Sequence, residues 1–146
     1  MEVRILYLSV TGNTRALAQN LQKEGASLGD VVTLTEMHEQ TDLPAQDAPF
    51  VVLVPTYLEG GTGIDDSVRE VMTNPLLESL LEDENGAWLR GVIGTGNQNF
   101  NAQYVLTAKR YAQQFDVPLL GAVEMRGTSR DVTRLYAEIV KVLQDK

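Results

Sequence analysis

Apolar residues along the chain gather in five short runs, each of the length of a strand rather than a helix. The third run, Phe50–Val54, is apolar without a break, which is typical of a central strand buried on both faces of a sheet. The predicted strands are Val3–Leu8, Val31–Leu34, Phe50–Val54, Trp88–Ile93 and Val117–Glu124.

Between these strands, apolar residues recur at the spacing of helix faces. Leu17 and Leu21 share one face of a first helix, and Gly25 and Gly29 predict the turn that follows it. Further helices are predicted from Asp65–Ser67, with Val68, Val71 and Met72 on one face, and over Leu76–Leu81, Val105–Phe115 and Val132–Leu143, the last after a capping box at Thr128–Asp131.

Strands and helices mostly alternate, which predicts an α/β fold with a doubly wound parallel sheet and helices on both of its faces. The 146 residues fit a single domain, 1–146. The polar connection around His38 shows no helical stripe. We expect the flavodoxin-like strand order 2-1-3-4-5, which brings the carboxyl ends of the first, third and fourth strands together, where such sheets bind ligands.

The composition narrows the classes of function. A net charge of −8 and a pI of about 4.6 oppose nonspecific binding to nucleic acid or an anionic membrane. Without cysteine, redox chemistry requires a bound cofactor, and a single histidine does not favour a transition-metal site. No apolar run reaches the roughly 20 residues of a membrane span, and no signal-peptide pattern opens the chain. We therefore expect a cytoplasmic protein.

The turn from the first strand to the first helix has the chemistry of a phosphate site. It holds three hydroxyls, one glycine and one amide, and the helix start adds free N–H groups. The same residue types also cap ordinary helices, so an ordinary capped helix start stays open as the alternative. No lysine follows the glycine, which excludes a Walker-type loop. The candidates are Ser9, Thr11, Gly12, Asn13 and Thr14.

Two further loops are expected at the same edge of the sheet. One follows the third strand and carries Tyr57 among glycines, and the other follows the fourth strand and carries Phe100. Each aromatic side chain can face a planar ring or anchor its own loop. Arg15, just inside the helix, can offset a phosphate charge or point to solvent.

Two other ligand classes fit this edge less well. Gly94-Thr95-Gly96 begins a dinucleotide motif, but Asn99 replaces its last glycine and the loop does not follow the first strand. A phospho-receiver domain requires acidic residues at the ends of the first and third strands, where this chain has Ser9 and Thr56.

The loop at residues 9–14 resembles the phosphate loop of the flavodoxins. A narrower resemblance, to the NrdI family, rests on Gly91–Phe100, Gln103-Tyr104, Leu106–Lys109 and Glu124–Thr128. This family comprises the flavodoxin-like accessory proteins of class Ib ribonucleotide reductase. The resemblance implies noncovalently bound FMN. It also implies delivery of superoxide or peroxide, made from O2, to the reductase small subunit, which holds a dimanganese centre and a radical-forming tyrosine.

The resemblance also implies which residues contact FMN. Residues 9–14 hold its phosphate, the second loop lines one side of the ring and the third loop lines the other. Leu58 and Glu59 separate the tyrosine from the glycines, which is a departure from the family pattern, and Glu59 either acts on the ring proton or faces water. The implied ring contacts are Pro55, Thr56, Tyr57, Leu58, Glu59 and Gly60 on one side and Thr95, Gly96, Asn97, Asn99 and Phe100 on the other.

The charge of the third loop supports this chemistry independently. Residues 94–101 include no acid, so they oppose a fully reduced, anionic flavin less than acidic loops do. Such a loop suits two-electron chemistry with oxygen, and we expect no catalytic acid, base or nucleophile. The reductant is not identified by the sequence. Two alternatives stay open: a general electron-transfer flavodoxin, and a binding module that has lost the flavin.

Overall fold

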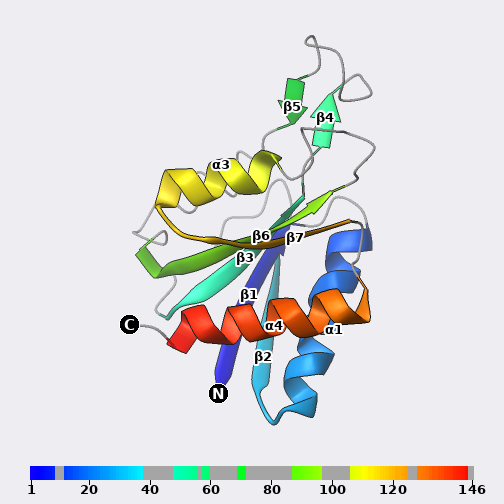
Figure 1. Cartoon of the computed structure of the whole chain (residues 1–146), viewed down its shortest axis with the longest axis vertical. Coiled ribbons are helices and arrows are strands. Elements are labelled where there is room, and N and C mark those ends of the chain that lie inside the picture. Colours follow the sequence, from blue (N-terminus) through cyan, green and yellow to red (C-terminus); the bar gives the residue numbers. More distant parts are fainter. Residues whose placement is uncertain are drawn as a thin grey trace.

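The computed structural model describes residues 1–8, 12–37, 48–55, 57–59, 69–71, 87–96, 106–124 and 128–144. Five parallel strands form its main sheet, in the order β2-β1-β3-β6-β7 (Figure 1). This is the predicted order 2-1-3-4-5, which is confirmed. The strands are β1 (Glu2–Leu8), β2 (Val31–Met37), β3 (Phe50–Pro55), β6 (Leu89–Gly96) and β7 (Leu119–Glu124).

The central position of β3 follows from its composition. All five residues of Phe50–Val54 are completely buried, as the uninterrupted apolar run predicts. In β1 the side chains alternate between two core clusters: Ile5 and Tyr7 belong to one cluster and Leu6 to the other. Each face of the sheet therefore has its own core.

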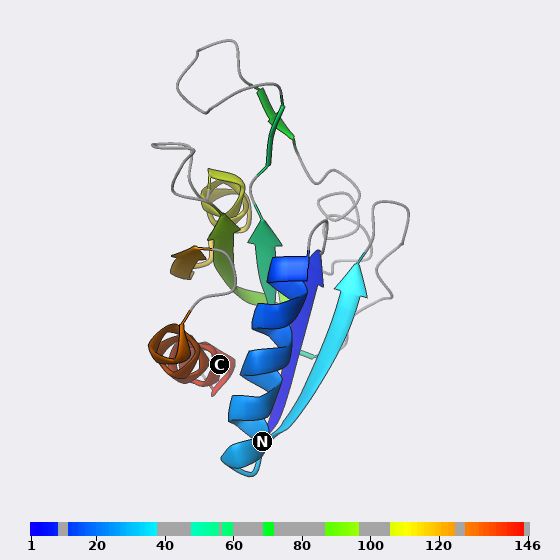
Figure 2. The same cartoon turned by 90° about the vertical axis from the view of Figure 1, so that its right-hand side faces the viewer.

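Helices cover both faces, as predicted. The helices α1 (Gly12–Ser27) and α4 (Ser129–Gln144) share one core cluster with β1, and they lie beside one another in Figures 1 and 2. The helix α3 (Leu106–Phe115) packs against the other cluster. The predicted apolar stripes are confirmed in α1 and α4, whose buried residues include Leu17, Leu21, Val132, Leu135, Tyr136 and Ile139.

The helix α1 continues through Gly25, where the sequence pattern predicted a turn. A Cβ atom at Gly25 would lie 2.4 Å from Cγ2 of Val32 and 2.6 Å from the hydroxyl oxygen of Tyr136. The glycine is therefore a point of close approach between α1, β2 and α4. The turn follows at Gly29, whose φ of 85° lies in the left-handed region that favours glycine.

A small antiparallel pair corrects the predicted helix after Asp65. The strands β4 (Tyr57–Glu59) and β5 (Arg69–Val71) pair with Tyr57 opposite Val71 and Glu59 opposite Arg69. Three-residue spacing is only a weak helix signal, and pairing with the preceding strand overrides it. The predicted helix start at Asp65–Ser67, the stripe Leu76–Leu81 and the connection around His38 lie outside the described residues.

The edges of the other elements also shift. The third loop does not begin at Gly94, because β6 continues to Gly96 and pairs with β7 there.

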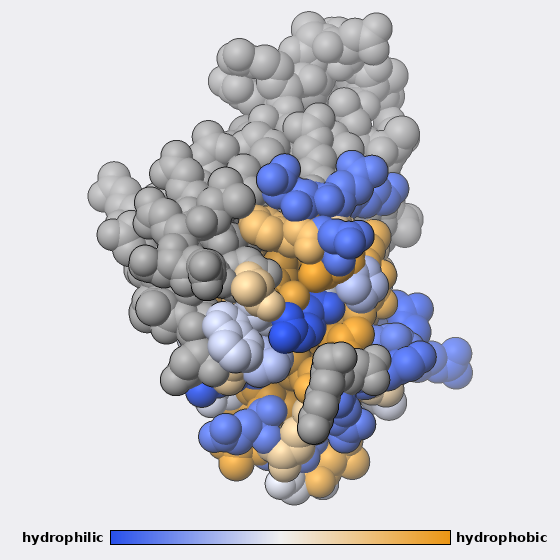
Figure 3. All heavy atoms as spheres, turned by 90° about the vertical axis from the view of Figure 1, so that its left-hand side faces the viewer, coloured by the Kyte–Doolittle hydropathy of each residue, from blue (hydrophilic) through white to orange (hydrophobic). Residues whose placement is uncertain are grey.

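In the described ranges, no helix is both long and apolar enough to cross a membrane. Figure 3 shows apolar residues over the middle of one side of the molecule, with hydrophilic residues among and beside them.

Candidate functional site

The carboxyl ends of β1, β3 and β6 meet at one edge of the sheet. Tyr7 of β1 pairs with Leu53 of β3, and Pro55 of β3 pairs with Thr95 of β6. The arrowheads of these strands point to the same end of the molecule in Figure 2. Chain order reverses between β1 and β3, since β2 lies on one side and β6 on the other. This switch point is where open parallel sheets bind ligands.

A pair of buried hydroxyls joins the start of α1 to the end of β6. Oγ1 of Thr14, in the first turn of α1, lies 3.1 Å from Oγ1 of Thr95, near the end of β6. The two side chains are 1% and 2% exposed, and they are the buried polar side chains among the described residues. Two predicted site residues that are 81 positions apart in the chain are therefore in direct contact.

Strand alternation explains why Thr95 reaches Thr14. Ile93 lies in the core cluster that α1 shares with the sheet. Side chains two residues apart in a strand point to the same face, so Thr95 faces α1 as well. The sequence pattern ends this strand at Ile93 and leaves Thr95 in a loop, where the direction of a side chain is not fixed. The contact follows from the continuation of β6 to Gly96.

The start of α1 is well suited to an anion. The helix has no acidic residue in its first turn. The first N–H groups of any helix have no partner within the helix and carry partial positive charge. The start of α4 differs, since Thr128 N–H donates to Oδ2 of Asp131 at 2.9 Å and Asp131 N–H donates to Oγ1 of Thr128 at 3.2 Å. This confirms the predicted capping box. At the start of α4, the carboxylate of Asp131 therefore already accepts a backbone N–H bond.

Arg15 is held by a partner from β2. Its Nε donates to Oε1 of Glu36 at 2.9 Å, and its Nη2 forms an ion pair with the same oxygen. The hydrogen bond to Glu36 raises the pKa of the Arg15 guanidinium. Burial and the Glu36 charge raise the pKa of Tyr7, while a hydrogen bond from Arg15 opposes this rise. Much of the charge of Arg15 is therefore balanced within the protein.

Sequence reasoning missed this cluster of Tyr7, Arg15 and Glu36. The parallel register places Tyr7 of β1 opposite Glu36 of β2, and α1 begins beside them. The strand order predicts that the ends of the first two strands are neighbours, but it does not specify which side chains meet there.

The remaining predicted site residues are described in part or not at all. Gly12 and Asn13 open α1, Pro55 ends β3 and Gly96 ends β6, while Tyr57, Leu58 and Glu59 form β4. Their contacts with a ligand stay predictions. Outside the described residues lie Ser9, Thr11, Thr56, Gly60, Asn97, Asn99 and Phe100.

Comparison with known proteins decides the family. A family model described as NrdI flavodoxin-like matches residues 5–137. The chain belongs to the NrdI flavodoxin-like family. A putative NrdI-like protein of Streptococcus pyogenes serotype M18 is 41% identical over 143 residues, which cover 95% of this chain and 93% of the relative. Protein NrdI of Bartonella bacilliformis is 33% identical over 132 residues, 90% of each chain.

Solved flavodoxins share the fold of this NrdI-family chain. A short-chain flavodoxin associated with a bacterial microcompartment superimposes with a TM-score of 0.64, at 18% identity, over 99% of this chain and 97% of that one. At this identity, the likeness supports the fold alone. It agrees with the strand order described above.

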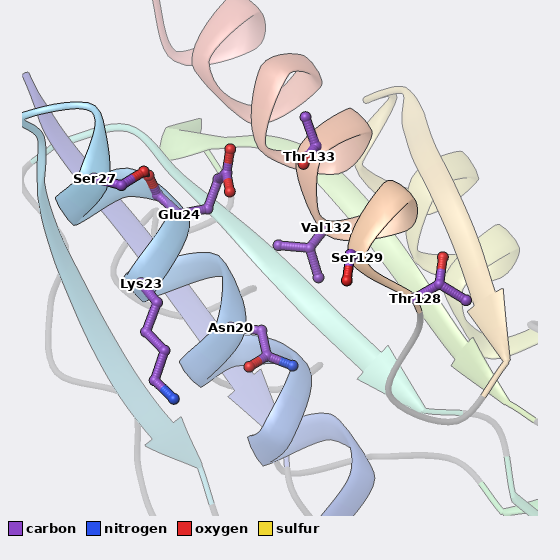
Figure 4. Close-up of a pocket in the computed structure, with 8 residues that line it drawn as sticks. All are labelled: Asn20, Lys23, Glu24, Ser27, Thr128, Ser129, Val132 and Thr133. Carbon is purple, nitrogen blue, oxygen red and sulfur yellow. The ribbon is translucent and has the colours of Figure 1, made fainter.

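A groove in this NrdI-family chain lies away from the strand ends. It has a volume of about 410 Å³, runs between α1 and the start of α4, and contains none of the predicted site residues (Figure 4). Lys23 and Glu24 bring opposite charges to it, and no buried polar group faces it. Within the described ranges, no group of three or more His, Cys, Asp or Glu residues could hold a metal ion. The groove is lined by Asn20, Lys23, Glu24, Ser27, Thr128, Ser129, Val132 and Thr133.

Proposed function

We propose that this chain binds FMN and, when reduced, supplies superoxide or peroxide to the small subunit of class Ib ribonucleotide reductase. The oxidant would assemble the dimanganese and tyrosyl-radical cofactor of that subunit. The observation that carries this proposal is the NrdI family match over residues 5–137, which spans the sheet and the three strand ends.

The residues at the edge of the sheet fit the phosphate of FMN. The α1 N-terminus offers N–H groups with no acid in the first turn to compete for them. Thr14 adds a buried hydroxyl from the same turn. Since Arg15 is engaged with Glu36, the phosphate would be held mainly by neutral donors, as residues 9–14 of the sequence suggest.

The ends of β3 and β6 would place the ring. They lie side by side at Pro55 and Thr95. Bound FMN supplies the redox chemistry, since one electron passed to O2 gives superoxide and two electrons with two protons give hydrogen peroxide. The protein would contribute position, a neutral third loop and a docking surface. We place it in the cytoplasm with its reductase partner.

The test combines reduced protein, manganese-loaded small subunit and O2, and follows the tyrosyl radical by electron paramagnetic resonance. We expect radical only when FMN is bound and all three components are present. The matched control is the same protein stripped of FMN. If no radical forms, while a separate activator of known competence succeeds with the same small subunit, the proposal fails.

The competing function is general electron transfer. It remains an alternative because the chain shares its fold with solved flavodoxins. A shuttle works best with two well-separated one-electron potentials, whereas oxidant delivery works best with a small gap between them. A reductive titration of the FMN-loaded protein measures that gap. We expect a small gap, because residues 94–101 place no acid beside the ring.

A further inference from the structure

The contact between Thr14 and Thr95 requires a physical reason, because burying hydroxyls is costly. An unsatisfied buried hydroxyl destabilises the folded state, whereas valine would fill the same space without that cost. Both side chains are almost fully buried, and they come from two different elements, α1 and β6.

Counting protons shows that the pair alone is not satisfied. Each hydroxyl has one proton to donate and can accept through its oxygen lone pairs. The 3.1 Å contact uses one of the two protons, and the other must be donated elsewhere. No second acceptor for it lies among the described residues. Of the two side chains, Thr14 is the one in the first turn of α1, where an anion is favoured.

We propose that Thr95 is a positioning residue for phosphate: its hydroxyl donates to Thr14, which leaves the Thr14 proton directed at the phosphate of bound FMN. At physiological pH, a fully ionised phosphate has no proton to donate and can only accept hydrogen bonds. The hydroxyl that faces it therefore has to donate. The oxygen of that hydroxyl is then free to accept from Thr95, and the two bonds polarise one another. This inference rests on the proposed function and changes the predicted role of Thr95 from ring contact to phosphate support.

Two flavins separate these roles, because riboflavin has the ring of FMN without the phosphate. Thr95→Val should weaken FMN binding about tenfold and leave riboflavin binding within about twofold of wild type. Thr95→Ser keeps the hydroxyl and should restore the affinity for FMN. The affinity for inorganic phosphate, measured by its competition with FMN, should fall in Thr95→Val by a similar factor. Dissociation constants come from fluorescence titrations of the flavin-free protein.

A double-mutant cycle tests whether Thr95 acts through Thr14. In Thr14→Val the partner is already lost, so adding Thr95→Val should weaken FMN binding no further. Thr133→Val, an exposed threonine of α4, is the matched control and should change neither flavin's affinity. Thermal unfolding of each flavin-free variant shows whether the fold is intact.

Each contrary outcome has its own meaning. Equal loss of FMN and riboflavin in Thr95→Val would overturn the inference in favour of a ring contact. No loss of either flavin would leave the pair with a role in folding only and would also overturn it. A wild-type protein that binds neither flavin contradicts the proposed function itself, whereas FMN binding that ignores Thr95 contradicts this inference alone.

Discussion

At the scale of residues, two of the hydrogen-bonded polar clusters in the described residues lie at opposite ends of the sheet. Thr14 and Thr95 lie at the carboxyl ends of the strands. At the other end, Tyr136 donates to Oδ2 of Asp30 at 2.5 Å, and the amino terminus of Met1 lies 3.3 Å from Oδ1 of Asp30. We propose that the first cluster supports a ligand site, whereas the second ties α4 to the start of β2 and serves stability.

Tyr136→Phe should therefore lower the melting temperature by roughly 3–6 °C at pH 7, because Oδ2 of Asp30 loses its donor. The hydrogen bond from Tyr136 lowers the pKa of Asp30 below its ordinary value of 3.8. A lowered pKa contributes stability that is present above pH 3.8 and is lost as the pH falls through the folded-state pKa. The difference between wild type and variant, measured by thermal melts, should shrink in that range. A difference that stays constant down to pH 2 would contradict this assignment.

At high pH, the hydrogen bond between Tyr136 and Asp30 matters through its donor, because it raises the pKa of Tyr136 while it lowers that of Asp30. Burial, together with the hydrogen bond to Asp30, raises the pKa of Tyr136 well above its ordinary value of 10. A phenol with a raised pKa contributes stability that is complete below pH 10 and declines as the pH rises above it. Thermal melts of wild type should therefore lose stability above pH 10 more steeply than those of Tyr136→Phe. Equal slopes would argue against the buried phenol as the cause.

At the scale of elements, the position of α1 depends on one glycine. Alanine normally favours a helix over glycine by about 1 kcal/mol. At Gly25 the added methyl would collide with Val32 and Tyr136, and overpacking of this kind costs about 1–3 kcal/mol. Because both neighbours belong to other elements, the collision would push α1 away from the sheet.

Gly25→Ala should therefore destabilise the protein, although helix propensity alone predicts the reverse. Chemical denaturation measures the change in free energy of unfolding. Gln19→Ala, at an exposed position of the same helix, is the control and should stay within about 0.5 kcal/mol of wild type. A stabilised Gly25→Ala variant would show that α1 does not approach β2 as closely as described.

The elements also show what a sequence pattern can predict. The five strands and their order follow from continuous apolar runs and from the geometry of parallel crossovers, and both are confirmed. The pair of β4 and β5 was missed because three-residue strands are too short to show a period. The end of β6 was missed because Gly94 and Gly96 read as loop residues, although pairing with β7 holds them in the sheet.

At the scale of the whole molecule, the site depends on convergence. The sequence predicted that three loops would meet at one edge, because the strand order requires it. It could not predict the contact of Thr14 with Thr95 or the pairing of Arg15 with Glu36, since both depend on which face a side chain takes at the very end of a strand. Family membership adds the chemistry that the fold alone leaves open.

The most direct measurement is a titration of the isotope-labelled, flavin-free protein with FMN, followed by backbone amide NMR. We predict saturation at one FMN per chain, with the largest shifts at the start of α1, around Thr14, and at the end of β6, around Thr95 and Gly96. The amides of Lys23–Ser27, beside the groove between α1 and α4, serve as the internal control and should shift little. Absence of binding, or shifts confined to that groove, would contradict the account.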